Sequence, residues 1–143
     1  MKKPIIAFVL AAVSIFIVAC SNANPGSGAQ TGKVIKSASA GNNLTVTLST
    51  ADGVLRKGQQ EIFLIFTDAS GKSVDVGAVS FNNQMQAMGS MPVMNNGATL
   101  TTTATPGVYR GEINVEMAGE WQSQIAYEGA AGKGKASFSV TAQ

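Results

Sequence analysis

The sequence predicts an all-β fold, an immunoglobulin-like sandwich of seven to eight antiparallel strands. Between residues 33 and 143, apolar side chains recur at every second position, which is the spacing of half-buried strands. No apolar period of 3.6 residues persists over three turns in this region, so helices are not expected. Turn-forming residues separate the runs about every 8 to 12 positions, as in small β-sandwiches. A chain of 143 residues has room for one such domain but not for two.

The individual strands follow from the alternation. Residues 44–48 alternate Leu and Val with Thr, and residues 61–66 are apolar on both faces, which predicts a central strand. Residues 74–81 resume the pattern less regularly after a turn at 68–72. We expect the Thr-rich residues 98–105 to form an exposed edge strand. The remaining strands are expected within residues 109–117, 121–128 and 136–141.

The N-terminal residues 1–19 are predicted to be a signal peptide. Lys2 and Lys3 precede an apolar run over residues 5–19 that is interrupted only by Ser14. A helix of that length reaches roughly 22 Å, whereas the hydrocarbon core of a bilayer is about 30 Å thick. The segment is therefore too short to span a membrane comfortably and is typical of an exported precursor.

The run ends in Ile17-Val18-Ala19-Cys20, which resembles the lipobox of bacterial lipoproteins. This resemblance implies cleavage before Cys20 and lipidation of its thiol, hence a protein anchored in the cell envelope. In a bacterium with two membranes, Ser21 would favour the outer membrane, facing the periplasm. The alternatives are an ordinary secretory signal followed by an incidental thiol, or an uncleaved anchor. Residues 20–32 are rich in Gly, Ser and Asn and are predicted to form a flexible tether before the domain at 33–143.

Charge and composition exclude several functions. Without Lys2 and Lys3, the 10 basic residues become 8 and equal the 8 acidic ones, so no electrostatic signal for nucleic acid is present. The chain has no histidine, and its single cysteine is the predicted lipidation site. Nucleophile and base arrangements therefore lack their usual members, and we do not expect an enzyme.

The most unusual segment is residues 82–97, because four of the six methionines recur there at every third position: Met85, Met88, Met91 and Met94. Gly89 and Pro92 disfavour a helix, and residues 95–97, Asn-Asn-Gly, suggest a turn. We therefore expect a loop at one end of the sandwich that is extended near Pro92. In a threefold, polyproline-like conformation all four side chains would lie on one side.

Three interpretations of this methionine segment remain open. The side chains could fill an irregular gap at the end of the core, or they could form an exposed hydrophobic contact for a partner. Alternatively, their soft, neutral thioethers could bind copper(I) or silver(I), and the absence of histidine disfavours copper(II) and zinc. Met117 is an additional candidate ligand. Trp121 could support a bound cation through its π face, although a core tryptophan is the more common role.

Several motifs resemble the YtkA-like and FixH-like envelope domains. They are Leu55 and Gly58 before the strand at 61–66, the Met-Gly-Ser-Met-Pro-x-Met segment at 88–94, and Met117-Ala118-Gly119-Glu120-Trp121. The resemblance implies an immunoglobulin-like sandwich and an association with heavy-metal efflux.

We therefore expect a lipid-anchored protein that captures copper(I) or silver(I) for sequestration or for transfer to an efflux adaptor. The alternative is an envelope interaction module whose methionines contact another envelope protein.

Overall fold

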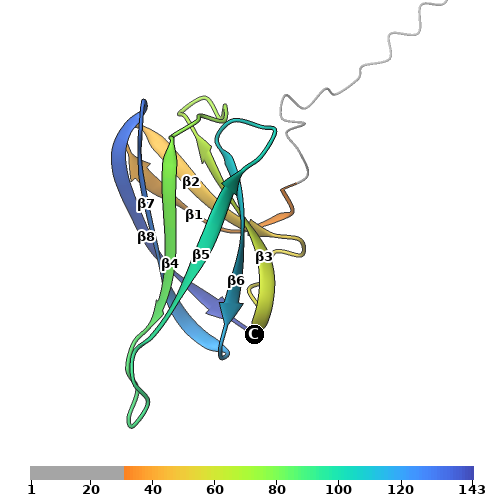
Figure 1. Cartoon of the computed structure of the whole chain (residues 1–143), viewed down its shortest axis with the longest axis vertical. Coiled ribbons are helices and arrows are strands. Elements are labelled where there is room, and N and C mark those ends of the chain that lie inside the picture. Colours follow the sequence, from red (N-terminus) through yellow and green to blue (C-terminus); the bar gives the residue numbers. More distant parts are fainter. Residues whose placement is uncertain (1–30) are drawn as a thin grey trace, which may run out of the picture.

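The computed structural model describes residues 31–143, which form eight β-strands and no helix (Figure 1). No helix within residues 31–143 is long and apolar enough to cross a membrane. The predicted signal peptide at 1–19, the lipidation site Cys20 and most of the tether lie outside the described residues. The strands are β1 (Lys33–Gly41), β2 (Leu44–Thr50), β3 (Gly58–Thr67), β4 (Ala78–Met85), β5 (Met94–Thr102), β6 (Val108–Val115), β7 (Gly119–Gly129) and β8 (Gly132–Ala142).

All strand neighbours are antiparallel, in the order β1-β2-β3-β6-β5-β4-β7-β8. Numbering β2 to β8 as strands A to G gives the two immunoglobulin sheets, ABED and CFG, with β1 as an additional strand beside A. β5 joins the sheets, because its first half pairs with β4 and Thr99–Thr102 pair with β6. The prediction of an immunoglobulin-like sandwich with seven to eight strands is therefore confirmed.

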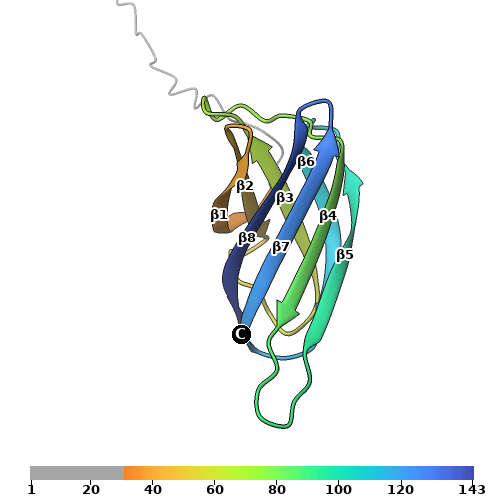
Figure 2. The ribbon, with the colours of Figure 1, turned by 90° about the vertical axis from the view of Figure 1, so that its left-hand side faces the viewer.

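At the other edges of the two sheets, β1 and β8 lie side by side (Figure 2), and hydrogen bonds join the sheets there. Near the C-terminus, the amide of Lys57 donates to the carbonyl of Gln143 at 2.8 Å, and the amide of Gln143 donates to the carbonyl of Leu55 at 2.9 Å. At the end of β1, the Asn42 side chain donates to the Tyr127 hydroxyl and to the Lys133 carbonyl, both at 3.0 Å. The sandwich is thus tied on both long sides.

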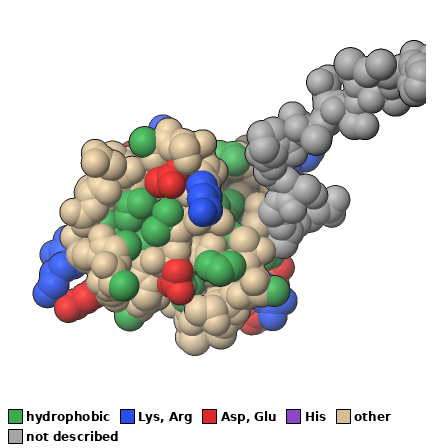
Figure 3. Space-filling model, turned by 90° about the horizontal axis from the view of Figure 1, so that it is seen from above, with side chains coloured by type: hydrophobic (Ala, Val, Ile, Leu, Met, Phe, Trp, Pro, Cys, Tyr) green, Lys and Arg blue, Asp and Glu red, His purple; other side chains and the backbone are tan. Residues whose placement is uncertain are grey.

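The core lies between the sheets and is built from the inward positions of the alternating strands. β3 is central, between β2 and β6, as its apolar sequence predicts. Trp121 and Phe66 are the largest fully buried side chains. The ring of Phe66 makes edge contacts with Tyr109 and Tyr127 at centroid distances of 5.8 and 5.4 Å. Seen from the end opposite the β4–β5 hairpin, acidic and basic side chains are interspersed at the surface, in keeping with the even charge balance (Figure 3).

Two expectations about the strands need correction. The Asn-Asn-Gly sequence at 95–97 is not a turn, because it lies within β5, which begins at Met94. Hydrogen bonding to β4 overrides the turn preference of these residues, and Asn96 is buried against the core. The Thr-rich segment is an edge as expected, but a shorter one: Thr99–Thr102 pair solely with β6, Ala98 still pairs with β4, and the strand ends at Thr102 instead of residue 105.

Candidate methionine site

The methionine segment forms a long β-hairpin that projects from one end of the sandwich (Figures 1 and 2). Only residues 86–93 connect β4 to β5, and they contain their own tight turn. Met88 and Met91 exchange backbone hydrogen bonds, 3.2 Å from Met88 N to Met91 O and 2.9 Å from Met91 N to Met88 O. Between them, Gly89 has φ of 58°. Glycine at the first central position is typical of a type II′ turn, whose twist suits a hairpin.

The expected polyproline-like arrangement is therefore wrong, although the segment does lie at one end of the sandwich. An antiparallel ribbon satisfies the backbone groups of Met88 and Met91, which an isolated extended loop would leave to water. Pro92, which has no amide hydrogen, lies in the short unpaired stretch between this bridge and β5. The methionines consequently face each other as pairs across the hairpin.

The two pairs differ in environment. Met85 lies directly opposite Met94 at the base of the hairpin. Met85 is only 2% exposed and belongs to the core, while Met94 is half-buried and packs against it. At the tip, Met88 and Met91 are 56% and 39% exposed. One pair therefore continues the core, and the other lies in solvent.

The segment from Met117 to Trp121 lies against the base of this hairpin. A Cβ atom on Gly119 would lie 3.0 Å from the terminal methyl of Met85, so the missing side chain gives Met85 its space. The fully buried indole of Trp121 donates from Nε1 to the Met117 carbonyl at 3.0 Å. The indole thus occupies the place of a core tryptophan, and Met117 is half-buried against the core.

A shallow hollow of about 230 Å³ lies beside the hairpin base. Met85 and Met88 line it together with Glu120, the one acidic side chain of the lining. The other lining residues are Gln84, Gln86 and Gln122. Glu120 is not among the site residues predicted from the sequence, although it stands inside the Met117–Trp121 motif.

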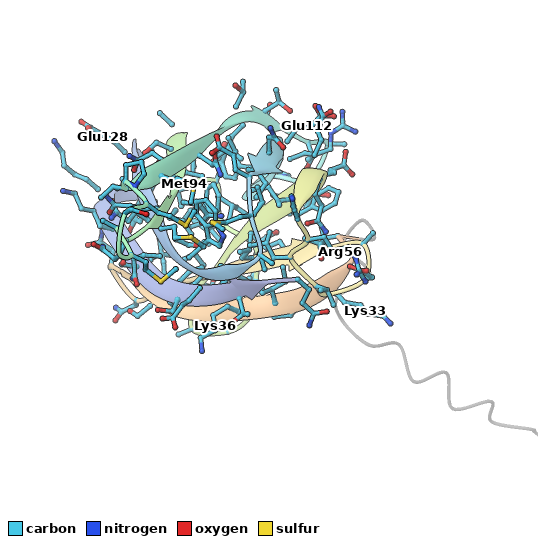
Figure 4. All side chains as sticks on the ribbon, turned by 90° about the horizontal axis from the view of Figure 1, so that it is seen from below. Lys33, Lys36, Arg56, Met94, Glu112 and Glu128 are labelled. Carbon is cyan, nitrogen blue, oxygen red and sulfur yellow. The ribbon has the colours of Figure 1, made fainter. Side chains whose placement is uncertain are left out.

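The structure brings the predicted site residues together unequally. Met85 is paired with Met94 and shares the hollow with Met88, whereas Met91 is paired with Met88 alone. In the view from the hairpin end, several sulfur atoms lie near the labelled Met94 in projection (Figure 4). Within residues 31–143, no three His, Cys, Asp or Glu side chains form a group that could hold a metal ion.

Three side chains outside this site have shifted pKa values. A hydrogen bond from Arg56 lowers the pKa of Asp52, and the Ser70 hydroxyl lowers the pKa of Asp68. Burial raises the pKa of Tyr109, and its hydrogen bond with Asp75 acts in the same direction. None of these groups lines the hollow beside Met85.

Comparison with known proteins places the chain in a family. A family model described as YtkA-like matches residues 38–126, more than half of the chain. No curated protein matches the chain. Among solved structures, the ZirS C-terminal domain is similar, with 14% sequence identity and a TM-score of 0.44 over 100% of this chain and 87% of that one. The segment that the family model matches, residues 38–126, contains both methionine pairs and the Met117–Trp121 motif. The chain belongs to the YtkA-like family.

Proposed function

We propose that the protein captures copper(I) or silver(I) through the thioethers of its β4–β5 hairpin. The observation that supports this most is the cross-strand pairing of Met85 with Met94 and of Met88 with Met91. Side chains directly opposite on antiparallel strands have Cβ atoms about 4.5–5.5 Å apart. Because methionine has three flexible torsions, two opposed sulfur atoms can reach one ion between them.

The exposed pair is the better entry point for the metal. Met88 and Met91 are accessible at the tip, and Met88 shares a hollow with the deeper Met85. An ion held first at the tip could then gain Met85 as a third sulfur ligand. Soft, singly charged ions prefer such sulfur donors. Glu120, at the rim of the same hollow, would place a negative charge near the cation.

Met94 and Met117 have supporting places in this proposal. Met94 lies opposite Met85 and is partly accessible, so it can complete the inner pair. Met117 lies in the motif that packs against Met85 through Gly119. Thioethers need no deprotonation and form no disulfides, so the site would operate in an oxidising envelope.

The cellular role we infer is binding and transfer, not catalysis. Lipidation of Cys20 would hold the domain at a membrane of the cell envelope, on the outer membrane facing the periplasm in a bacterium with two membranes. From there it would sequester the ion or pass it to a heavy-metal efflux adaptor. This inference rests on the lipobox-like sequence and on the family resemblance of the methionine motifs.

A second function is favoured by the exposure of the tip. Three of the four large apolar side chains exposed in the described domain lie on the hairpin, namely Met88, Met91 and Val93. The connecting residues 86–93 carry no charge. An uncharged, projecting, apolar tip is also suited to contact another envelope protein.

Competition for copper(I) with a weak chromogenic chelator tests the proposal. We expect the purified protein to withdraw copper(I), and the Met88→Leu/Met91→Leu variant to bind it at least tenfold more weakly. Loss of outer-shell partners alone commonly costs about 10–100-fold in metal affinity, so loss of ligands should cost no less. Val93→Leu, which changes the same tip but keeps every sulfur, is the control. Equal uptake by the double variant would exclude the tip methionines as ligands, and equal uptake after all four hairpin methionines are changed to leucine would exclude the metal site.

The same variants separate the second function. Leucine preserves the apolar surface of the tip, whereas Met88→Ser/Met91→Ser removes both surface and sulfur. If envelope function survives the leucine changes and fails with serine, the tip acts as a hydrophobic contact. Val34→Ser serves as a control, because Val34 is 60% exposed and belongs to β1, far along the chain from the hairpin.

A further inference from the structure

A buried polar cluster lies in the interior next to the inner methionine pair. Asn83 on β4 lies directly opposite Asn96 on β5 and beside Ser123 on β7. Asn83 and Ser123 are 0% exposed and Asn96 is 9% exposed. The Ser123 hydroxyl donates to Asn83 Oδ1 at 2.6 Å. Three polar side chains from three adjacent strands therefore face the core at one level.

The hydrogen bonding of this cluster is incomplete within the protein. The side-chain amide nitrogens of both Asn83 and Asn96 are buried, and neither has a hydrogen-bond partner among the described residues. Leaving a buried amide donor unpaired is unfavourable, and native proteins almost always satisfy such groups with protein atoms or with ordered water. Because the two unpaired donors belong to directly opposed residues, one acceptor placed between them would satisfy both.

We propose that Asn83 and Asn96 bind one buried water molecule between them. The water oxygen would accept a hydrogen bond from each amide nitrogen. One of its hydrogens would be donated to the Ser123 oxygen, whose own hydrogen is used by Asn83 Oδ1. Three hydrogen bonds are the usual number for a buried water. The site takes a neutral molecule that both donates and accepts, since no charged side chain belongs to the cluster.

This water site fixes the register of the hairpin. Asn83 and Met85 share one face of β4, and Met94 and Asn96 share the facing positions of β5. A slip of two residues along one strand would keep the faces but place Asn83 opposite Met94. That shift would separate the two amides from their common water. The polar pair thereby favours the alignment in which methionine faces methionine.

Nuclear magnetic resonance on the isotope-labelled full chain without metal tests the site directly. We expect the side-chain amide protons of both Asn83 and Asn96 to show cross-peaks with a long-lived water molecule. We also expect Asn96→Leu to abolish the cross-peak at Asn83, because the water loses one of its ligands. Absence of water cross-peaks in the unmodified chain, or a direct bond from one asparagine amide to the other, would overturn the proposal.

Stability measurements give an independent test. Asn83→Leu and Asn96→Leu should each lower the folding equilibrium constant by about tenfold, since each strands the remaining polar partners. The double variant should lose much less than the product of the two effects, because the leucines would replace amides and water together. Asn95→Leu, at the exposed neighbouring position, is the matched control. If each single change raised the folding constant, the amides would be unsatisfied and the site would not exist. Because no metal is used, the outcome is independent of the proposed copper(I) binding.

Discussion

Met85 and Met94 are directly opposed across the hairpin, yet Met85 is 2% exposed while Met94 is half-buried. The methyl of Met85 also reaches Gly119 at the start of β7. Met85 therefore packs in the core and also lies opposite a second methionine, Met94. Its structural role and its proposed ligand role can be separated only by substitutions that change one property at a time.

Met85→Ala should destabilise the domain by about 2–5 kcal/mol, the range for truncation of a buried methionine. Met85→Leu preserves most of the volume and should cost less than about 1.5 kcal/mol. Denaturant unfolding measures both values. If Met85→Leu keeps stability but weakens copper(I) binding, Met85 is a ligand as well as a core residue. A stability loss for Met85→Ala below about 0.5 kcal/mol would contradict the buried position.

Gly119→Ala should disturb the inner methionine pair without removing any sulfur. The new Cβ would lie 3.0 Å from the Met85 methyl, and Gly119 has φ of 134°, a conformation that alanine rarely adopts. Strain of this kind costs about 1–3 kcal/mol. Unfolding experiments should show this loss, and chelator competition should show weaker copper(I) binding. Ala118→Ser at the exposed adjacent position provides the control.

The sequence predicted the sandwich because alternation is strong wherever one face is buried, as along β6 and β7. It failed at the methionine hairpin for a definite reason. Asn83 and Asn96 are polar residues on the buried face, so they break the apolar alternation that would have extended β4 and β5 to Met85 and Met94. The cross-strand arrangement of the methionines depends on the turn at Gly89. The sequence predicts a turn more strongly at Asn95-Asn96-Gly97 than at Gly89, so the position of the hairpin turn did not follow from it. The Met117–Trp121 motif is visible in the sequence, but only the structure shows that its glycine, Gly119, accommodates Met85.

Alkaline pH should destabilise the domain through Tyr109. Burial raises the pKa of its hydroxyl above the ordinary value of 10.0, and the Asp75 carboxylate, 3.0 Å away, acts in the same direction. The neutral phenol is thus favoured in the folded state. Its stabilisation is complete below pH 10 and is lost as pH rises from about 10 through the higher folded pKa. Across this pH range, the Tyr109→Phe variant should lose less stability than the unmodified protein, as measured by unfolding experiments. That variant should already be less stable at pH 7 by about 1–3 kcal/mol, because Asp75 and the Val76 amide lose a partner.

Acid should act on the turn that follows β3. Asp68 Oδ1 accepts hydrogen bonds from the Ser70 hydroxyl at 2.6 Å and from the amides of Ser70 and Lys72 at 2.8 and 3.1 Å. The Ser70 bond is the main cause of the lowered pKa of Asp68. A carboxylate with a lowered folded pKa stabilises the protein above its unfolded pKa near 3.8, and this contribution is lost as pH falls through the folded value. Asp68→Asn should therefore flatten the decline in stability below pH 4. If the pH dependence of stability in acid were the same in this variant, the Asp68 carboxylate would not contribute to it.

Copper(I) affinity should change little between pH 5 and 8, which distinguishes thioether binding from the commoner metal chemistries. Histidine and thiolate ligands lose a proton on binding metal, so their affinity rises with pH. The chain has no histidine, and its one cysteine is Cys20. Methionine sulfur carries no proton to release when it binds a metal ion. Chelator competition at several pH values, corrected for protonation of the chelator, measures the slope. A rise of tenfold per pH unit would require a deprotonating ligand and would contradict a site made from methionine, whereas a flat profile that disappears in Met88→Leu/Met91→Leu would identify the tip sulfurs as the ligands.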